Sequence, residues 1–320
     1  MHLFSQISYQ LSNQEIESVY YPGQATTMLG MLKYPNDFQL AQGLNQLWYK
    51  DSSTTTVNNT GFTLRQAYII QKPTTKGTFS FCIPLRHIFG FCDDYNKFIY
   101  GFKHTQTLVR KGDTEAIFRN ALAAAGKVNL DKTSLIMPYV TCDSIRFRVN
   151  LYKSIKSKVT LPVTFRARQC NTITVLQSTR FSWRLSVKTS PEKPRYVIVG
   201  FQTNKDGNQE VNSSIFDHCD LYYIMLNQER YPAVDYNLSF PNHHFLRAYR
   251  DASVFSEKFY GTNDLITQSN ITPSDYKDLY PLFVFDVSRQ SEKLKSSVVD
   301  VQINATFNAA VPADMKRLLL

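Results

Sequence analysis

The sequence predicts an all-β protein that folds as two antiparallel sandwiches or jelly rolls in tandem, with a few short helices in the connections. Short segments of alternating polar and apolar residues recur along its 320 residues, and turn-forming residues separate them. The segments are not separated by regular helices as in β-α-β units, so we expect the strands to pair antiparallel. Aromatic residues are plentiful, with 22 Phe and 19 Tyr, which favours strands over helices.

Twelve segments are predicted to be strands. The clearest is the last, in which Val301, Ile303 and Ala305 face inward while Gln302 and Asn304 face outward. The predicted strands are residues 65–71, 78–84, 97–102, 105–110, 134–140, 145–151, 163–168, 180–188, 196–202, 221–227, 281–287 and 298–307.

Three short helices are predicted between the strands. Asn242 can cap a helix that ends at Gly261, because the apolar residues of 245–259 recur at helical spacing. Thr272 and Pro273 have the residue types of a helix start, and that helix is expected to end by residue 280. Residues 113–125 form the third, with a weaker apolar stripe.

The best internal boundary is the proline-containing segment 190–195. Pro191 and Pro194 cannot both lie in a central strand. We therefore expect a first jelly roll over residues 1–190, a linker over 191–195 and a second jelly roll over 196–320.

The excess positive charge lies in one stretch, residues 143–195. This stretch holds twelve basic and two acidic residues, which accounts for the whole net charge of +10. On the predicted strands, basic residues alternate with apolar ones, so each strand is expected to bury one row and expose a cationic one. The residues expected to contact an anion or a neighbouring subunit are Arg146, Arg148, Lys153, Lys156, Lys158, Arg166, Arg168, Arg180, Arg184 and Lys188.

Two interpretations of these cationic strand faces stay open. Lys and Arg on strands are often ordinary solvated residues that also prevent stray pairing of sheet edges. A segregated field can instead attract a polyanion or determine how copies of one protein pack together. In the second case, replacing Arg146, Arg148, Arg166 and Arg168 with Gln is expected to weaken the contact without unfolding the protein.

The sequence contains no convincing catalytic or metal-binding motif. The segment 217–220 (Asp-His-Cys-Asp) gathers a base, a thiol and two carboxylates, but the expected role is to cap a strand or turn. His243 and His244 lack the spacing of a zinc pair. Asp93 and Asp94 could bind a hard cation, although two adjacent acids are usually a solvated turn. We therefore expect no enzymatic activity and no cofactor or metal.

Cysteine use and the first residues predict a protein that folds inside the cell. The five cysteines are widely spaced without a CxxC pair, which favours reduced thiols. Residues 1–6 lack the basic and apolar parts of a secretion signal, and no run approaches the about 18 apolar residues of a membrane span. We expect the protein to be made in the cytoplasm or nucleus and not to be secreted.

Several motifs between Thr78 and Pro312 go beyond composition. They are Cys82-Ile83-Pro84-Leu85-Arg86-His87-Ile88-Phe89-Gly90-Phe91, Asp93-Asp94-Tyr95, Tyr100-Gly101, Leu108-Val109-Arg110-Lys111, Pro191-Glu192-Lys193-Pro194-Arg195, Ile215-Phe216-Asp217-His218-Cys219-Asp220, Arg230-Tyr231-Pro232, Leu282-Phe283-Val284-Phe285-Asp286-Val287 and Val311-Pro312. In these stretches the chain resembles the double jelly-roll capsid-like proteins of virus-derived elements in animal genomes, akin to the Polinton and adintovirus group.

The resemblance implies a major-capsid-type subunit. Two eight-stranded jelly rolls would stand side by side, and three subunits would form a pseudo-hexagonal trimer. Such trimers would tile an icosahedral shell around double-stranded DNA. The implied partners are further copies of the chain, a minor penton-type capsid protein and DNA in non-specific contact. The implied location is a virion or capsid-like particle.

The chain departs from the family after Val311 and Pro312. There the family has further β sequence, whereas this chain has residues 313–320. We expect the second jelly roll to lack a terminal strand, which would leave backbone groups unpaired or invite a strand from another subunit.

Two other functions stay open for a chain with this sequence. A host-retained jelly-roll module would bind glycan or protein without forming a shell. Its aromatic platforms would be Tyr20-Tyr21, Trp48-Tyr49 or Tyr222-Tyr223, although core or interface packing is the simpler role for each pair. A cupin-like metal enzyme would need clustered His and Glu ligands, and the six histidines are scattered.

Overall fold

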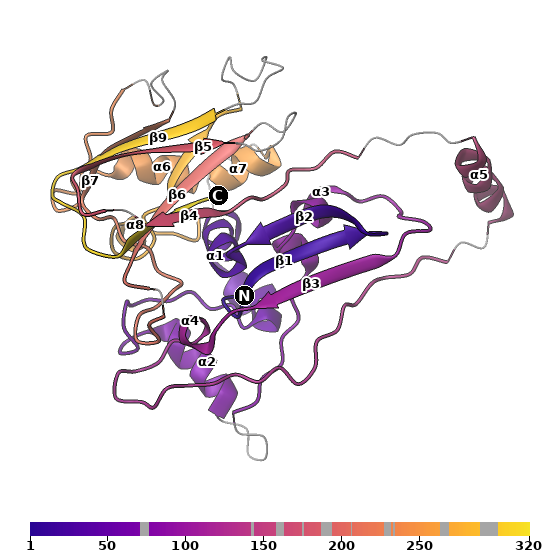
Figure 1. The fold of residues 1–320 in the computed structure, drawn as a ribbon, viewed down its shortest axis with the longest axis horizontal. Helices are drawn as coiled ribbons and strands as arrows, with labels where there is room; N and C mark the ends of the chain where they lie inside the picture. Colours follow the sequence, from indigo (N-terminus) through magenta and orange to yellow (C-terminus); the bar gives the residue numbers. More distant parts are fainter. Residues whose placement is uncertain are drawn as a thin grey trace.

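The residues that the structure describes form three antiparallel sheets with short helices in the connections (Figure 1). The computed structural model describes residues 1–70, 77–141, 144–157, 163–174, 176–186, 194–205, 207–226, 232, 234–262, 269–288 and 300–320. Buried apolar residues from Leu3 to Leu319 belong to one hydrophobic cluster, so the sheets share a continuous core.

The first sheet has three strands in the order β2-β1-β3. They are β1 (Phe4–Leu11), β2 (Gln14–Tyr20) and β3 (His104–Arg110). Ser12 and Asn13 connect β1 to β2 with positive φ angles of 46° and 70°. Two successive positive φ values give a tight hairpin turn whose twist matches that of the strands.

The other two sheets pack face to face as a sandwich. The four-stranded sheet has the order β4-β10-β6-β8, and the three-stranded sheet has the order β5-β9-β7. The ring of Phe201 on β6 lies 5.5 Å from that of Phe307 on β9 and 6.3 Å from that of Phe181 on β5, which places these rings between the sheets. The strands are β4 (Asn171–Thr174), β5 (Arg180–Ser186), β6 (Tyr196–Thr203), β7 (Leu221–Leu226), β8 (Phe283–Asp286), β9 (Asp300–Phe307) and β10 (Met315–Leu319).

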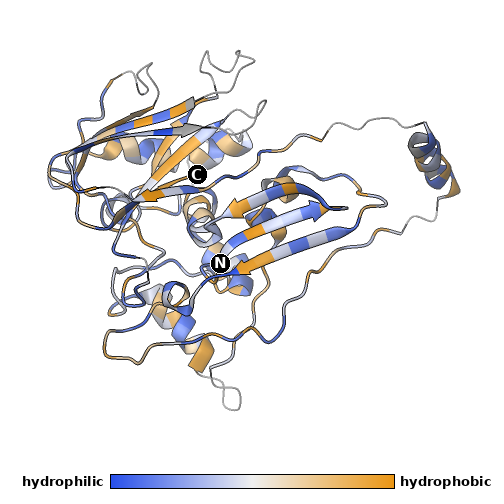
Figure 2. Ribbon diagram, viewed as in Figure 1, coloured by the Kyte–Doolittle hydropathy of each residue, from blue (hydrophilic) through white to orange (hydrophobic). Residues whose placement is uncertain are grey.

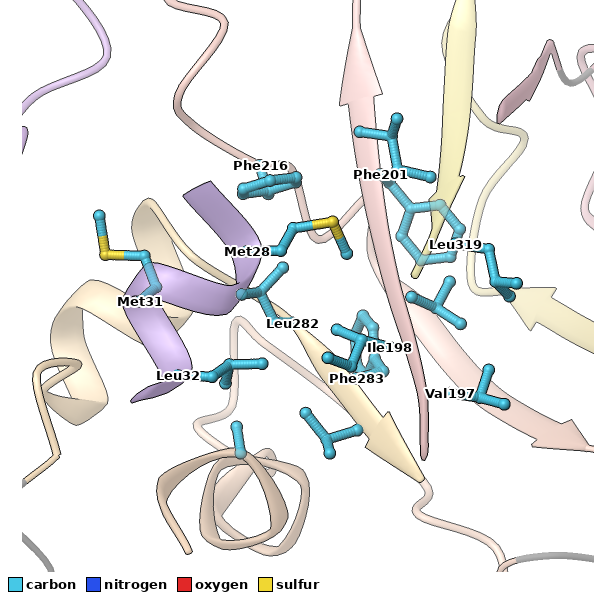
Figure 3. Packing of buried hydrophobic residues seen from close by; sticks show 14 of the residues in the cluster. Met28, Met31, Leu32, Val197, Ile198, Phe201, Phe216, Leu282, Phe283 and Leu319 are labelled. Carbon is cyan, nitrogen blue, oxygen red and sulfur yellow. The ribbon is translucent and has the colours of Figure 1, made fainter. Parts of the chain in front are cut away.

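Helix α1 (Pro22–Lys33) connects the first sheet to the sandwich. Figure 3 shows Met28 and Leu32 of this helix beside Phe216 and Leu282, which adjoin the four-stranded sheet. Gly200 on β6 permits this close packing, because a Cβ there would lie only 2.8 Å from the Phe216 ring. The remaining helical elements are η1 (Phe38–Leu40), η2 (Gln42–Gln46), α2 (Thr60–Ile70), η3 (Leu85–His87), α3 (Gly90–Asp94), α4 (Asp113–Ala116), α5 (Ile145–Lys156), α6 (Leu246–Ser253), α7 (Phe255–Tyr260) and α8 (Pro273–Asp278).

Six of the predicted strands are confirmed, with shifts of a few residues at their ends. They are the predicted strands that became β3 and β5 to β9. Two predicted helices are also confirmed. Residues 246–260 form α6 and α7 before Gly261, with Phe245 rather than Asn242 at the start, and Thr272 caps α8 through a capping box with Asp275. The predicted helix 113–125 is formed only as far as Ala116.

Six predicted strands are wrong. Residues 65–70 belong to α2 and 145–151 to α5, while 78–84, 97–102, 134–140 and the described residues of 163–168 form no strand. In 145–151 the alternating pattern also places Ile145, Val149 and Tyr152 at helical spacing, so the period alone could not exclude a helix. The strands β1, β2, β4 and β10 were not predicted.

Strands on both sides of the predicted boundary belong to the same two sheets. β4 and β5 precede residue 190, yet β4 pairs with β10 and β5 pairs with β9. No strand was expected in residues 313–320, whereas β10 lies between β4 and β6 within the four-stranded sheet. Residues 191–193 lie outside the described residues, and the division at 191–195 stays a prediction.

Candidate contact surface and buried charge cluster

The predicted cationic residues occupy three different environments. Arg146, Arg148, Lys153 and Lys156 are exposed on α5, and Arg180 and Arg184 are exposed on β5. Arg166 and Arg168 are partly or fully buried, and Lys158 and Lys188 lie outside the described residues. The prediction that these residues form cationic strand faces is therefore wrong for α5 and for Arg166 and Arg168. It holds for Arg180 and Arg184, which are exposed on the edge strand β5 and alternate with Phe181 and buried Trp183.

Helix α5 lies at the end of a long extended excursion from the body of the protein (Figure 1). We call the described residues between 127 and 165 the arm. Its apolar side chains are largely exposed, with exposed fractions of 95% at Tyr139, 78% at Ile136 and 77% at Ile145. Figure 2 shows that apolar and polar residues are mixed along α5, so that the helix presents apolar and basic groups together.

Arg166 connects the end of the arm to helix α3. Its Nε lies 2.9 Å from the Asp94 carboxylate, its backbone N–H donates to the same carboxylate at 2.7 Å, and its guanidinium covers the Phe259 ring at 3.8 Å. Burial opposes the ionisation of Asp94, but the hydrogen bonds and charge of Arg166 outweigh burial and hold the pKa of that carboxyl below its usual value.

Arg168 belongs to a neighbouring and deeper ion pair. Its guanidinium lies 3.0 Å from Asp93, which also lies 2.7 Å from the ammonium of Lys33 on α1. The side chains of Lys33, Arg168 and Asp93 are only 6%, 7% and 12% exposed. Burial, together with the charge of Arg168, lowers the pKa of Lys33 to about 8. Asp93 and Asp94 are thus counter-ions within the fold rather than a solvated turn.

Glu17 on β2 fixes the backbone beside these pairs. Its carboxylate accepts hydrogen bonds from the backbone N–H groups of Gly90, Phe91 and Arg168 at 2.8 to 3.0 Å. Burial raises the pKa of Glu17 despite these bonds. Gly90 is required for the contact, because a Cβ there would lie 1.7 Å from the carbonyl oxygen of Arg166. We call Glu17, Lys33, Asp93, Asp94, Arg166 and Arg168 the buried charge cluster.

The segment 217–220 serves the turn before β7. The Asp217 carboxylate accepts the Thr203 N–H at 2.6 Å, and His218 Nδ1 accepts the Asp220 N–H at 2.8 Å. Burial raises the pKa of Cys219 to about 12, so its thiol stays protonated and is a poor nucleophile. These contacts fit the capping role expected from the sequence.

The described part of the chain contains neither a group of metal ligands nor a helix that could cross a membrane. Among those residues, no three His, Cys, Asp or Glu side chains are grouped as a metal would require. Within the same residues, no helix has both the length and the apolar content of a membrane span.

The three aromatic pairs have different surroundings. Tyr222 and Tyr223 contact each other on β7 with ring centroids 6.0 Å apart, and Tyr21 lies under the ammonium of Lys111. Trp48 packs edge-on against Tyr34 and Phe38 at 5.5 and 5.4 Å. Trp48 and Tyr49 also line a large cavity next to α1 and α2.

Comparison with known proteins identifies the family. A model of the double jelly roll-like domain matches residues 1–319. The chain belongs to the double jelly roll-like domain family. This confirms the resemblance to double jelly-roll capsid-like proteins and the all-β fold class, while the likeness to the Polinton and adintovirus group stays a resemblance. No curated protein matches the chain.

Proposed function

We propose that the chain is a structural capsid-type subunit that assembles into pseudo-hexagonal trimers, and that these trimers form an icosahedral shell around double-stranded DNA. Membership of the double jelly roll-like domain family supports a capsid-type fold. The protonated thiol of Cys219 and the use of Asp93 and Asp94 as internal counter-ions fit a structural rather than a catalytic role.

The exposed apolar surface of the arm carries the proposal. Soluble monomers rarely leave large contiguous apolar surfaces in water, and such surfaces mark interaction sites. The arm leaves Ile136, Tyr139, Val140, Ile145 and Tyr152 at least 65% exposed. Burying each of these side chains would contribute about 1.5–3 kcal/mol. A second copy of the chain is the partner that the family favours.

The basic residues supply the second part of the proposed contact. Arg146, Lys153 and Lys156 on α5 adjoin the apolar residues of the arm, so a partner would meet charge and apolar surface together. Acidic groups of a neighbouring subunit or the phosphates of packaged DNA could neutralise them. A minor penton-type capsid protein is a further partner, and a particle assembled in the cytoplasm or nucleus is the proposed location.

The proposal is tested by the mass of the assembled protein. Light scattering on the full chain at near-physiological salt is expected to give a trimer or a larger species, and electron microscopy is expected to show hexagonal particles or sheets. Ile136→Asp and Tyr139→Asp should shift the mass toward the monomer. Leu40→Asp is the matched control, because Leu40 is 74% exposed but lies outside the arm.

Two outcomes would contradict the proposal. If the wild-type chain remains a monomer at high concentration, the proposed self-association is wrong. A trimer that both arm variants retain would show that the arm does not form the contact. Circular dichroism of each variant confirms that the fold is intact.

A further inference from the structure

A cavity of about 1020 Å³ lies next to α1 and α2. Large apolar side chains make up much of its wall, among them Trp48, Phe62, Ile70, Phe79, Phe81 and Phe118. Three apolar residues of the wall, Val57, Ile70 and Phe81, are at least 36% exposed, so the apolar surface continues from the cavity to the outside of the molecule. Apolar surface of this extent that stays in contact with water marks an interaction site.

The charged side chains of the cavity wall are either paired within the chain or exposed to solvent. The ion pairs are Arg65 with Asp51, Arg119 with Glu210, and Glu115 with Lys111. Lys127 is exposed. Burial is the main cause that lowers the pKa of His2 to about 3 and that of His87 to about 4, so both rings are neutral at pH 7. A charged group that entered the cavity would therefore lose hydration without gaining a counter-charge, and the cavity fits an uncharged apolar occupant.

One stretch of the arm matches this requirement. Residues 135–140 have the sequence Leu-Ile-Met-Pro-Tyr-Val, which carries no charge. They belong to no helix or strand, and Ile136, Tyr139 and Val140 are at least 65% exposed, so the chain's own surface does not cover them. Helix α5, by contrast, carries Arg146, Lys153 and Lys156, and its charges do not suit the cavity. The neutral segment is thus the part of the arm that the cavity can accept.

The segment and the cavity are two different surfaces of one chain. Figure 1 shows the arm extending away from α2 and carrying α5 at its far end. When a protruding surface fits a concave surface elsewhere on the same chain, copies join head to tail, and the series either closes into a ring or continues as a filament. A closed ring of three gives each chain one donated arm and one received arm.

We propose that residues 135–140 of one chain insert into the cavity next to α1 and α2 of a second copy, and that their apolar side chains contact its aromatic wall. The basic helix α5 stays outside the cavity. This inference rests on the proposed function, because it names the site that receives the arm in the assembled protein.

The first test introduces charge into the cavity rather than into the arm. Phe81→Asp and Ile70→Asp should each lower the mass from light scattering to about one third of the trimer mass, because a carboxylate would be buried in an apolar contact. Both positions are exposed, so the fold should tolerate the change, and circular dichroism checks this. Leu40→Asp serves as the control here too, because Leu40 is exposed and does not line the cavity.

The masses distinguish this inference from the proposed function. If the arm variants become monomers while Phe81→Asp and Ile70→Asp remain trimers, the protein assembles through the arm but the cavity does not receive it. That result would overturn the inference and leave the proposed function in place. A wild-type monomer would instead remove the proposed function, and the inference with it.

The second test is a disulfide between chains. Cys82→Ser and Cys142→Ser first remove the native cysteines that are nearest in sequence to the introduced ones. A chain with Tyr139→Cys is then co-expressed with a longer, tagged chain that carries Phe81→Cys, and mild oxidation should link one chain of each kind. Leu40→Cys in place of Phe81→Cys should give little of this mixed pair.

A single chain that carries both Tyr139→Cys and Phe81→Cys identifies the source of the arm. Linked dimers and trimers on a denaturing, non-reducing gel are expected from insertion into a second copy. If this chain forms the disulfide only within itself, the cavity receives its own arm and the inference is wrong. Absence of the mixed pair would likewise contradict it.

Discussion

Replacement of Asp93 by Asn should destabilise the protein strongly. Asp93 is the shared counter-ion of Lys33 and Arg168, and all three side chains are at most 12% exposed. Asn keeps the shape of the side chain but removes its charge, so Lys33 and Arg168 lose the carboxylate that they share. Removal of one partner from a buried ion pair costs about 3–5 kcal/mol, and we expect a loss in this range in the free energy of unfolding.

The pH dependence of this loss gives a second readout. The pKa of Lys33 in the folded protein, about 8, lies below its unfolded value of 10.5, so the unfolded state binds more protons between these values. Stability therefore rises with pH in this window. In Asp93→Asn the folded pKa of Lys33 should fall further, because a favourable charge is gone. The deficit relative to wild type should then shrink as the pH rises from 7 to about 8, and above that pH the two stabilities should rise in parallel, because Lys33 is neutral in both folded proteins.

The assay is equilibrium unfolding in urea, followed by the fluorescence of Trp48 and Trp183. Lys97→Gln is the matched control, because Lys97 is exposed outside the arm and a surface substitution usually changes stability by less than about 0.5 kcal/mol. If Asp93→Asn and Lys97→Gln unfold at the same urea concentration, the cluster does not stabilise the fold and the reasoning is refuted.

Three further predictions concern Gly90, His87 and the basic residues of α5. Gly90→Ala should cost about 1–3 kcal/mol through overpacking against Arg166, measured by urea unfolding, whereas Gly112→Ala, whose nearest Cβ neighbour is 3.6 Å away, should be nearly neutral. His87 has a folded pKa of about 4 against 6.5 when unfolded, so stability should fall as the pH drops from 6.5 toward 4, and unfolding midpoints of His87→Phe should fall less steeply. Replacing Arg146, Lys153 and Lys156 with Gln should reduce the slope of the logarithm of the DNA-binding constant against the logarithm of salt concentration, by about one for each lost phosphate contact. If the slopes of wild type and variant are equal, α5 does not contact DNA.

The sequence was sufficient to predict the parts of the fold in which local pattern and tertiary packing agree. β9 alternates strictly and is buried on one face, and Thr272 begins α8 with a capping box that its own residues form. The family resemblance predicted the double jelly-roll class, which residue patterns alone could not have distinguished from other tandem sandwiches.

The errors arose where non-local contacts decide the structure. Residues 145–151 fit both a strand and a helix, and no neighbouring strand pairs with them among the described residues. Arg166 and Arg168 resembled exposed strand residues because their counter-ions, Asp94 and Asp93, lie more than 70 positions earlier. Because both arginines are ion-paired and at least partly buried, their replacement by Gln is now expected to destabilise the fold, and unfolding measurements on the variants test this. The sequence pattern that could have predicted the cluster is the combination of two adjacent acids, Asp93 and Asp94, with two arginines that are two positions apart.

The division of the basic residues also bears on which partner the arm meets. Arg166 and Arg168 are neutralised within the fold, so the outward field comes from residues such as those on α5 and β5. On α5 the basic groups stand beside Ile145, Val149 and Tyr152, which are all more than 40% exposed. Contact with a DNA backbone would satisfy the charges but leave these apolar side chains in water. A protein surface with an apolar centre and an acidic rim would satisfy both, so of the two partners proposed for the arm, its composition fits a second copy of the chain better than DNA.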